Sequence, residues 1–250
     1  MAEAPGASFD VLVEQASLTY DGAPLFRDLA FRLPAGTWTC LLGPSGVGKS
    51  SLIRLIAGLA PLESGSVRCS DGGPLAGRLA WMAQQDSLLP WLPVLGNVTL
   101  GARLRGQEPD LARARKLLEQ VGLTAQAHQR PATLSGGQRQ RTALARTLME
   151  DRPLVLMDEP FSALDAISRA RIQALAATLL AGRTVLLVTH DPLEALRLGH
   201  RIHIMAGSPA RIETAIRPDG PPPRDLHDPK LLTGQGELLA RLADAQDLAA

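Results

Sequence analysis

Hydrophobic residues in this chain gather in short runs near the start and in longer, helically spaced stretches further along. Three short runs, separated by turn sequences, predict an antiparallel β layer: Phe9–Val13, Ser17–Tyr20 and Leu29–Leu33. Next, Thr37–Leu42 is a continuous apolar run that ends at a glycine, and Ser50–Leu59 then has apolar residues spaced as on one face of a helix. The pattern predicts a strand, a glycine-containing loop and a helix in direct succession.

Two later apolar runs, Leu154–Met157 and Thr184–Thr189, are too short for helices and show no alternation of polar and apolar residues. Such runs are typical of strands buried on both faces of a parallel sheet. Between the glycine loop and the first of these runs, Asp110–Gly122 and Gln138–Met149 have helical spacing. The chain therefore predicts an α/β fold in which a mostly parallel sheet is interrupted by helices.

The same patterns divide the chain into parts. We expect one unit over residues 1–205, with its core at 1–84 and 150–205 and an inserted helical subdomain at about 85–149. A proline run then interrupts any regular element, and Leu231–Leu248 predicts an amphipathic helix in a C-terminal extension, residues 206–250. The residues predicted in phase on its apolar face are Leu238, Leu239 and Leu242.

Composition narrows the functional classes. At 250 residues and 45% hydrophobic, the chain is long enough to bury a core of its own. With 26 Lys and Arg against 25 Asp and Glu, the net charge of +1 gives no reason to expect a nucleic-acid partner. Two cysteines, Cys40 and Cys69, predict small core residues in a reducing compartment. No apolar run approaches the roughly 18 to 20 residues of a membrane span, so we expect no insertion by the chain itself.

The loop after the first buried strand contains two glycines five positions apart, followed by a lysine and a hydroxyl residue. Its residues are Gly43, Pro44, Ser45, Gly46, Val47, Gly48, Lys49, Ser50 and Ser51. Such glycines let successive backbone N–H groups point into one concavity, and the following helix adds its positive end. We expect this loop to bind ATP, with Lys49 on the β- and γ-phosphates and the Ser50 hydroxyl on Mg²⁺. The strand-to-helix context favours this interpretation over an ordinary glycine turn.

Two carboxylates follow the next buried strand directly. Asp158 and Glu159 stand at its carboxyl end, where ligands bind in parallel sheets. Adjacent strand residues point to opposite sides, so we expect the two to act differently. Asp158 is predicted to orient the Mg²⁺ shell, and Glu159 to polarise the water that attacks the γ-phosphate. Without a phosphate loop in the chain, the pair would be only a turn.

A second glycine motif precedes a helix: Ser135, Gly136, Gly137 and Gln138. By itself it could be a helix N-cap, but a second anion site at a helix start is also suited to a nucleotide held by another copy. With this motif the chain resembles the nucleotide-binding subunits of ATP-binding cassette (ABC) transporters, whose signature sequence it matches. The resemblance covers about Phe9 to Met205 and implies a phosphate-loop (RecA-like) core with an N-terminal antiparallel β layer and an inserted helical subdomain.

The resemblance assigns further residues. Tyr20 matches the aromatic residue that stacks on adenine, and Gln84 matches the glutamine that ligates the metal and couples to the membrane partner, with Gln85 as the alternative. His190 resembles the switch histidine that contacts the γ-phosphate. The dimer-crossing loop corresponds to Ser162, Ala163, Leu164 and Asp165. The other histidines, which have no such context, are expected on the surface: His128, His200, His203 and His227.

The resemblance also implies a function. We expect an ATPase, peripheral on the cytoplasmic face of a bacterial inner membrane, that works as a homodimer with transmembrane permease subunits and a solute-binding protein. The apolar segment Leu88–Leu95 is expected to expose part of its surface, Trp91 included, to the permease. The nitrate, sulfonate and taurine importers, with those for thiamine-precursor pyrimidines, are the most similar group. Alternatives are a non-transport ABC ATPase in DNA repair or regulation, another phosphate-loop motor, and a scaffold that binds ATP without turnover.

Overall fold

The computed structural model describes residues 8–20 and 22–247. The strands are β1 (Val11–Tyr20), β2 (Ala23–Leu33), β3 (Trp38–Leu42), β4 (Ser64–Cys69), β5 (Leu79–Met82), β6 (Leu154–Asp158), β7 (Thr184–Val188), β8 (Arg201–Ala206) and β9 (Arg211–Ile212). The helices are α1 (Lys49–Ile56), α2 (Val94–Val98), α3 (Leu100–Leu104), α4 (Leu111–Gln120), α5 (Gly136–Met149), α6 (Ala166–Leu179), α7 (Pro192–Leu198) and α8 (Pro229–Asp247).

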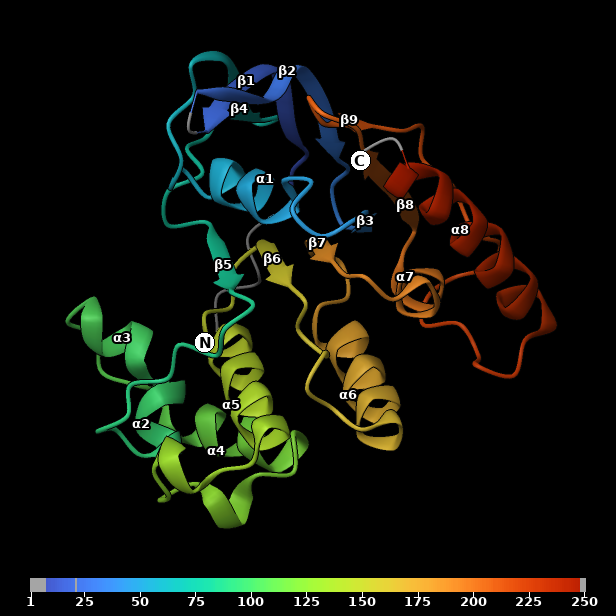
Figure 1. Ribbon diagram of the computed structural model, residues 1–250. Helices are drawn as coiled ribbons and strands as arrows, with labels where there is room; N and C mark the ends of the chain where they lie inside the picture. Colours follow the sequence, from blue (N-terminus) through green and yellow to red (C-terminus); the bar gives the residue numbers. More distant parts are fainter. Residues whose placement is uncertain (1–7, 21, 248–250) are drawn as a thin grey trace.

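Two sheets organise these elements (Figure 1). A three-stranded antiparallel sheet has the order β2-β1-β4, and a six-stranded sheet has the order β5-β6-β7-β3-β8-β9. In the larger sheet the first five strands are parallel, and only β9 runs antiparallel to its neighbour. Helix α1 lies between the two sheets, while α2 to α5 form a separate group to one side. The α/β fold with a mostly parallel sheet and an N-terminal antiparallel layer is confirmed.

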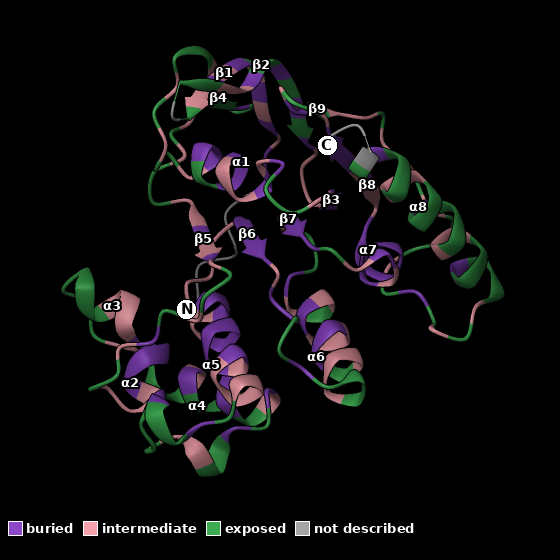
Figure 2. Cartoon of the chain, viewed as in Figure 1, coloured by how far each residue is buried: buried purple, intermediate pink, exposed green. Residues whose placement is uncertain are grey.

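The central strands are buried on both faces, as their unbroken apolar sequences predicted (Figure 2). In β6, Leu154 and Leu156 join the hydrophobic cluster that fills the space between the two sheets and α1. Val155 and Met157 join the second cluster, which packs the opposite face against the helices. Because successive side chains alternate between faces, one short strand contributes to both cores. Cys40 and Cys69 are buried, as predicted.

Several element bounds differ from the prediction. The first two predicted strands are one strand, β1, in which Gln15 adopts a positive φ of 48° and the register with β2 shifts. Such a bulge keeps a strand continuous while it bends. Strands β4 and β5 were not predicted, since β4 begins with the polar sequence Ser-Gly-Ser. The predicted helix end at Leu59 was wrong: α1 ends at Ile56, and Leu59 is exposed.

The C-terminal helix forms, and two of the three residues predicted on its buried face, Leu238 and Leu242, pack against the core. Leu238 is buried, whereas Leu239 is 51% exposed. Adjacent helical residues are about 100° apart, so both cannot face the core. The buried residues Leu231 and Leu238 are instead seven apart, with Ala245 seven further on. The end of the predicted helix, Leu248, lies outside the described residues.

Two histidines predicted on the surface are half-buried. His200 accepts a hydrogen bond from the Trp38 backbone N–H at 3.0 Å, and His203 Nδ1 lies 2.9 Å from the Glu213 carbonyl oxygen. Burial lowers the pKa of both rings below the usual value for histidine. His128 and His227 are exposed, as expected.

Helices α2 to α5 follow one another between β5 and β6, where the inserted helical subdomain was expected. Their treatment as a subdomain, and the division of the chain at residues 205 and 206, stay predictions. Within residues 8–20 and 22–247, none of the helices combines the length and the apolar character needed to cross a membrane.

Candidate functional site

The phosphate loop joins β3 to α1 and depends on glycine at two tight positions. A Cβ on Gly43 would lie 2.3 Å from the Met205 carbonyl oxygen, where no side chain fits. Gly48 has a φ of 109°, and a Cβ there would lie 2.9 Å from the Phe26 ring. Within the part of the chain that the structure describes, no side chain caps the start of α1. The backbone N–H groups there are thus suited to an anion.

Lys49 is held inside this loop. Its ammonium group donates hydrogen bonds to the carbonyl oxygens of Gly43 at 2.8 Å and Pro44 at 2.7 Å, and the residue is only 8% exposed. Burial lowers the pKa of Lys49, while the nearby carboxylates of Glu159 and Asp158 oppose that shift. The cation therefore stands between the loop and the two acids, where the phosphates of a nucleotide need positive charge.

Asp158 is the buried member of the carboxylate pair. It ends β6, is 4% exposed, and its pKa is raised chiefly by burial, against a hydrogen bond with Ser50. A buried carboxylate beside a hydroxyl is a donor set that suits a hard cation such as Mg²⁺. Two of the three residues that the sequence assigned to the metal, Ser50 and Asp158, are thus brought together.

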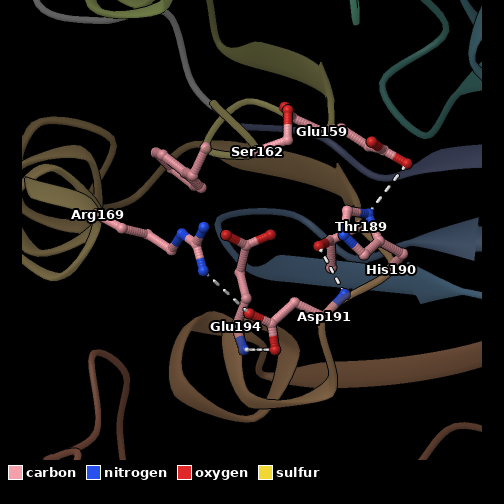
Figure 3. Close-up of a pocket in the computed structure, with 8 residues that line it drawn as sticks. Glu159, Ser162, Arg169, Thr189, His190, Asp191 and Glu194 are labelled. Atoms are coloured by element: carbon pink, nitrogen blue, oxygen red, sulfur yellow. Dashed lines mark hydrogen bonds and ion pairs between the residues drawn. The ribbon is translucent and has the colours of Figure 1, made fainter. Parts of the chain in front are cut away.

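Glu159 does not continue the strand, so strand alternation was the wrong reason to separate the two acids. Its φ is 49°, a left-handed conformation that turns the chain just after β6. Its Oε1 lies 3.3 Å from His190 Nδ1 (Figure 3). Gln84 Nε2 donates to its Oε2 at 3.3 Å. Glu159 and His190, which the sequence placed at the γ-phosphate, therefore converge with Gln84, which it assigned to the metal.

His190 follows β7, the neighbour of β6 in the sheet. Glu159 and His190 line one small cavity of about 30 Å³, together with Thr189, Asp191 and Glu194. Such a volume holds few water molecules. The His190 side chain is 65% exposed, so it can reach a group placed over the carboxyl ends of the strands.

The signature motif is a helix cap in this chain. Gln138 N donates to Ser135 Oγ at 3.2 Å, and Ser135 N donates to Gln138 Oε1 at 2.8 Å, which is a capping box at the start of α5. A Cβ on Gly137 would lie 3.4 Å from the Ala163 carbonyl oxygen. The motif thus adjoins the Ser162–Asp165 loop.

Gln140 belongs to the site but was missed in the sequence. Its Nε2 donates to the Glu159 carbonyl oxygen at 3.1 Å and to Ser162 Oγ at 3.2 Å, while its Oε1 accepts from Ala163 N at 2.8 Å. One buried side chain therefore ties the start of α5 to the end of β6 and to the Ser162–Asp165 loop. Its position two residues after the signature motif was the only signal in the sequence.

Tyr20 and Trp91 lie at the surface. Tyr20 is 69% exposed at the end of β1, which leaves its ring free for stacking. Trp91 is 65% exposed, whereas Leu88 is buried, so the apolar segment after Gln84 exposes part of its surface. Asn97 holds this segment: it accepts from Leu89 N at 2.7 Å and donates to the Leu92 carbonyl at 3.1 Å.

Comparison with known proteins decides the family. The family model described as "ABC transporter" matches residues 26–162, more than half of the chain. The chain belongs to the ABC transporter family. Within it, this chain carries the ATP-binding cassette: it is 47% identical to an uncharacterized ABC transporter ATP-binding protein of Haemophilus influenzae, over 94% of this chain and 100% of that one.

A second sequence relative and a solved structure are also similar to this ABC cassette. The aliphatic sulfonates import ATP-binding protein SsuB 2 of Burkholderia cenocepacia is 42% identical, over 92% of this chain and 86% of its own length. The structure is similar, with a TM-score of 0.75 and 29% identity, to the dimeric post-hydrolysis state of the ATP-binding cassette MJ0796 bound to ADP and Pi. That likeness covers 84% of this chain and 99% of the other.

Proposed function

We propose that this chain is the ATP-hydrolysing subunit of a bacterial ABC importer, and that two copies grip each ATP between them. One copy contributes Gly43–Ser51, and the other contributes Ser135–Gln138. Support comes from the cassette family, from the import protein of Burkholderia cenocepacia at 42% identity, and from the dimeric structure of the ATP-binding cassette MJ0796. The observation that carries the proposal is the convergence of Lys49, Asp158, Glu159 and His190 at the carboxyl ends of neighbouring strands.

The residues have distinct roles in this proposal. Lys49 leaves the carbonyl oxygens of its own loop and binds the β- and γ-phosphates, which offer a charged acceptor in their place. Ser50 and Asp158 hold Mg²⁺, with Gln84 as the third ligand. When bound, the metal supplies charge that offsets the phosphate oxygens.

Glu159 is the general base. Its carboxylate accepts a proton from the attacking water, and His190, 3.3 Å away, orients that carboxylate and contacts the γ-phosphate. Phosphate release removes the contacts that join the two copies, so the pair opens and a membrane partner follows the movement. We place the permease contact at the exposed Trp91, the adenine at Tyr20 and the dimer crossing at Ser162–Asp165.

The solute belongs to the small organic or oxyanion class. Sulfonate import is the activity in the name of the relative from Burkholderia cenocepacia, and it favours a sulfonate or a similar anion. The sequence of Met82–Asp86 resembles that of importers of thiamine-precursor pyrimidines, so these pyrimidines are the second candidate class of solute. A solute-binding protein would deliver the compound, and the chain would work at the cytoplasmic face of the inner membrane.

Turnover in the assembled complex tests this function. The chain should be co-purified with its permease, reconstituted in vesicles, and assayed for Mg²⁺-dependent ATP hydrolysis with sulfonates and pyrimidines supplied by the binding protein. We expect hydrolysis that rises with the correct solute and falls at least about 100-fold in Glu159→Gln. The matched control, Glu119→Gln on the exposed side of α4, should keep full turnover. Equal hydrolysis in Glu159→Gln and the wild type would contradict the assignment.

A further inference from the structure

A buried polar seam joins α6 to α7. From α6, Gln173 Nε2 donates to Glu194 Oε1 of α7 at 2.9 Å, and Arg197 Nη1 of α7 donates back to Gln173 Oε1 at 2.8 Å. Gln173 is 3% exposed and Glu194 is 5% exposed. Buried polar groups are costly unless hydrogen-bonded, so this chain of bonds fixes one relative position of the two helices.

The seam reaches the candidate catalytic residues directly. Glu194 lines the same small cavity as Glu159 and His190 (Figure 3), and its side chain points into it from α7. It also hydrogen-bonds with the side chain of Thr189, the residue before His190. Thr189 Oγ1 accepts from Asp191 N at 3.1 Å, so the turn that carries His190 is held on both sides.

We propose that Glu194 is a positioning residue for ATP hydrolysis: bonded to Gln173 and Thr189, it fixes the His190 turn against Glu159. Glu194 touches neither the phosphates nor the water in this arrangement, and acts through His190. The inference rests on the proposed function, because the proposed function gives His190 its role in ATP hydrolysis. It adds a residue that no local motif identified, since its partner Gln173 lies 21 positions away.

The charges around Glu194 decide which of its protonation states keeps this geometry. The groups that face it or its immediate partners are Asp191 and Arg197 of α7, Arg169 of α6, Cys40 of β3, and His190 and Glu159 across the cavity. Burial raises the pKa of Glu194 to about 7, against the hydrogen bonds with Thr189 and Gln173, which lower it; the Asp191 carboxylate adds to the rise and Arg169 opposes it. The neutral carboxyl therefore persists close to neutral pH.

Ionisation of Glu194 would compete for Arg169. That guanidinium now lies 3.7 Å from Asp191 and donates to the Leu164 carbonyl at 2.9 Å. Its Nε is buried without a hydrogen-bond partner in the described structure, so a donor stands ready for a charged Glu194. An ionised Glu194 attracts Arg169 and repels Asp191, which caps α7 immediately after His190. The neutral form is thus the one that leaves Arg169 beside Asp191.

Comparison of Glu194→Gln with the wild type across pH tests the proposal. Glutamine keeps the shape and hydrogen bonds of the neutral carboxyl but cannot ionise. We expect the ratio of variant to wild-type kcat to be close to one at about pH 6 and to rise at least about threefold by about pH 8.5, with the KM for ATP unchanged.

Glu194→Ala removes the acceptor for Gln173 altogether. We expect kcat to fall about tenfold or more while the KM for ATP stays within about twofold, because the nucleotide contacts are left in place. Glu119→Gln on α4 controls for the loss of one acid and should match the wild type at every pH. If Glu194→Ala does not fold, the ratio of kcat between Glu194→Gln and the wild type across pH tests the proposal by itself.

A ratio that stays constant over this pH range in an active enzyme would overturn the inference and leave the proposed function intact. A wild type that shows no Mg²⁺-dependent hydrolysis in the reconstituted complex would instead overturn the proposed function, and the positioning role with it.

Discussion

Replacing Arg224 should detach the C-terminal extension from the helix that follows His190. All five N–H groups of its guanidinium meet backbone carbonyls: Nε donates to Asp219, Nη1 to Leu196 at 2.6 Å and Gly199 at 2.9 Å, and Nη2 to Pro218 at 3.0 Å and Gly220 at 2.7 Å. The residue is 8% exposed. Two of these carbonyls end α7, so one side chain closes that helix and anchors the tail.

The loss of stability expected for Arg224→Met follows from the number of hydrogen bonds that the guanidinium makes. At about 1 kcal/mol net for each hydrogen bond, Arg224→Met should cost about 5 kcal/mol, reduced to about 4 because the exposed loop carbonyls regain water. For a chain of this size that corresponds to a fall in Tm of about 8 to 16 °C. Lysine has only three donors, so Arg224→Lys should lose about half as much.

Thermal and urea unfolding measure both variants. Arg217→Met is the matched control, because Arg217 lies on the same segment and is exposed. We expect the order wild type and Arg217→Met, then Arg224→Lys, then Arg224→Met. If Arg224→Met unfolded at the wild-type temperature, or if lysine restored full stability, the account of five shared hydrogen bonds would be refuted.

Two further predictions concern the site. Lys49→Ala should weaken ATP binding about 10- to 100-fold, since charge-assisted hydrogen bonds to phosphate contribute about 1.5 to 3 kcal/mol. The control variant Lys116→Ala, on the exposed side of α4, should bind ATP with the wild-type affinity. Titration calorimetry measures both affinities, and equal values for the two variants would contradict the role of Lys49. The contribution of Glu194 to the stability of the wild type should fall by about 3 kcal/mol as pH rises from about 4.5 to about 7, because its folded pKa lies above the ordinary value and the folded state binds the extra proton at the lower pH. The free energy of unfolding of Glu194→Gln, measured in urea, should not show this loss. If the free energies of the variant and the wild type changed in parallel with pH, the prediction would be contradicted.

The parts of the site that the sequence revealed are those carried by local motifs. The loop from Gly43 to Ser51 needs its glycines for reasons internal to the loop and its strand, so the motif and the geometry coincide. Glu159 and His190 were found because each follows a buried strand, and neighbouring parallel strands end at the same edge. That topology brings Glu159 Oε1 to 3.3 Å from His190 Nδ1.

Residues whose role depends on tertiary packing escaped prediction. Gln140, Gln173 and Glu194 are polar residues within helices, and such residues are usually exposed. Only the packing of α5 against the end of β6, and of α6 against α7, turns them inward. The same limit explains Leu239, which a helical pattern alone placed on the wrong face of α8.

The central claim is that each ATP site is shared between two copies, and the oligomeric state of Glu159→Gln tests it most directly. Sedimentation with Mg²⁺ and ATP should show a dimer that dissociates when ATP is replaced by ADP. The double variant Glu159→Gln, Gly137→Asp should stay monomeric, because a carboxylate in the signature motif repels the partner's nucleotide. A monomeric Glu159→Gln that still hydrolyses ATP, or a dimer indifferent to Gly137→Asp, would contradict the account.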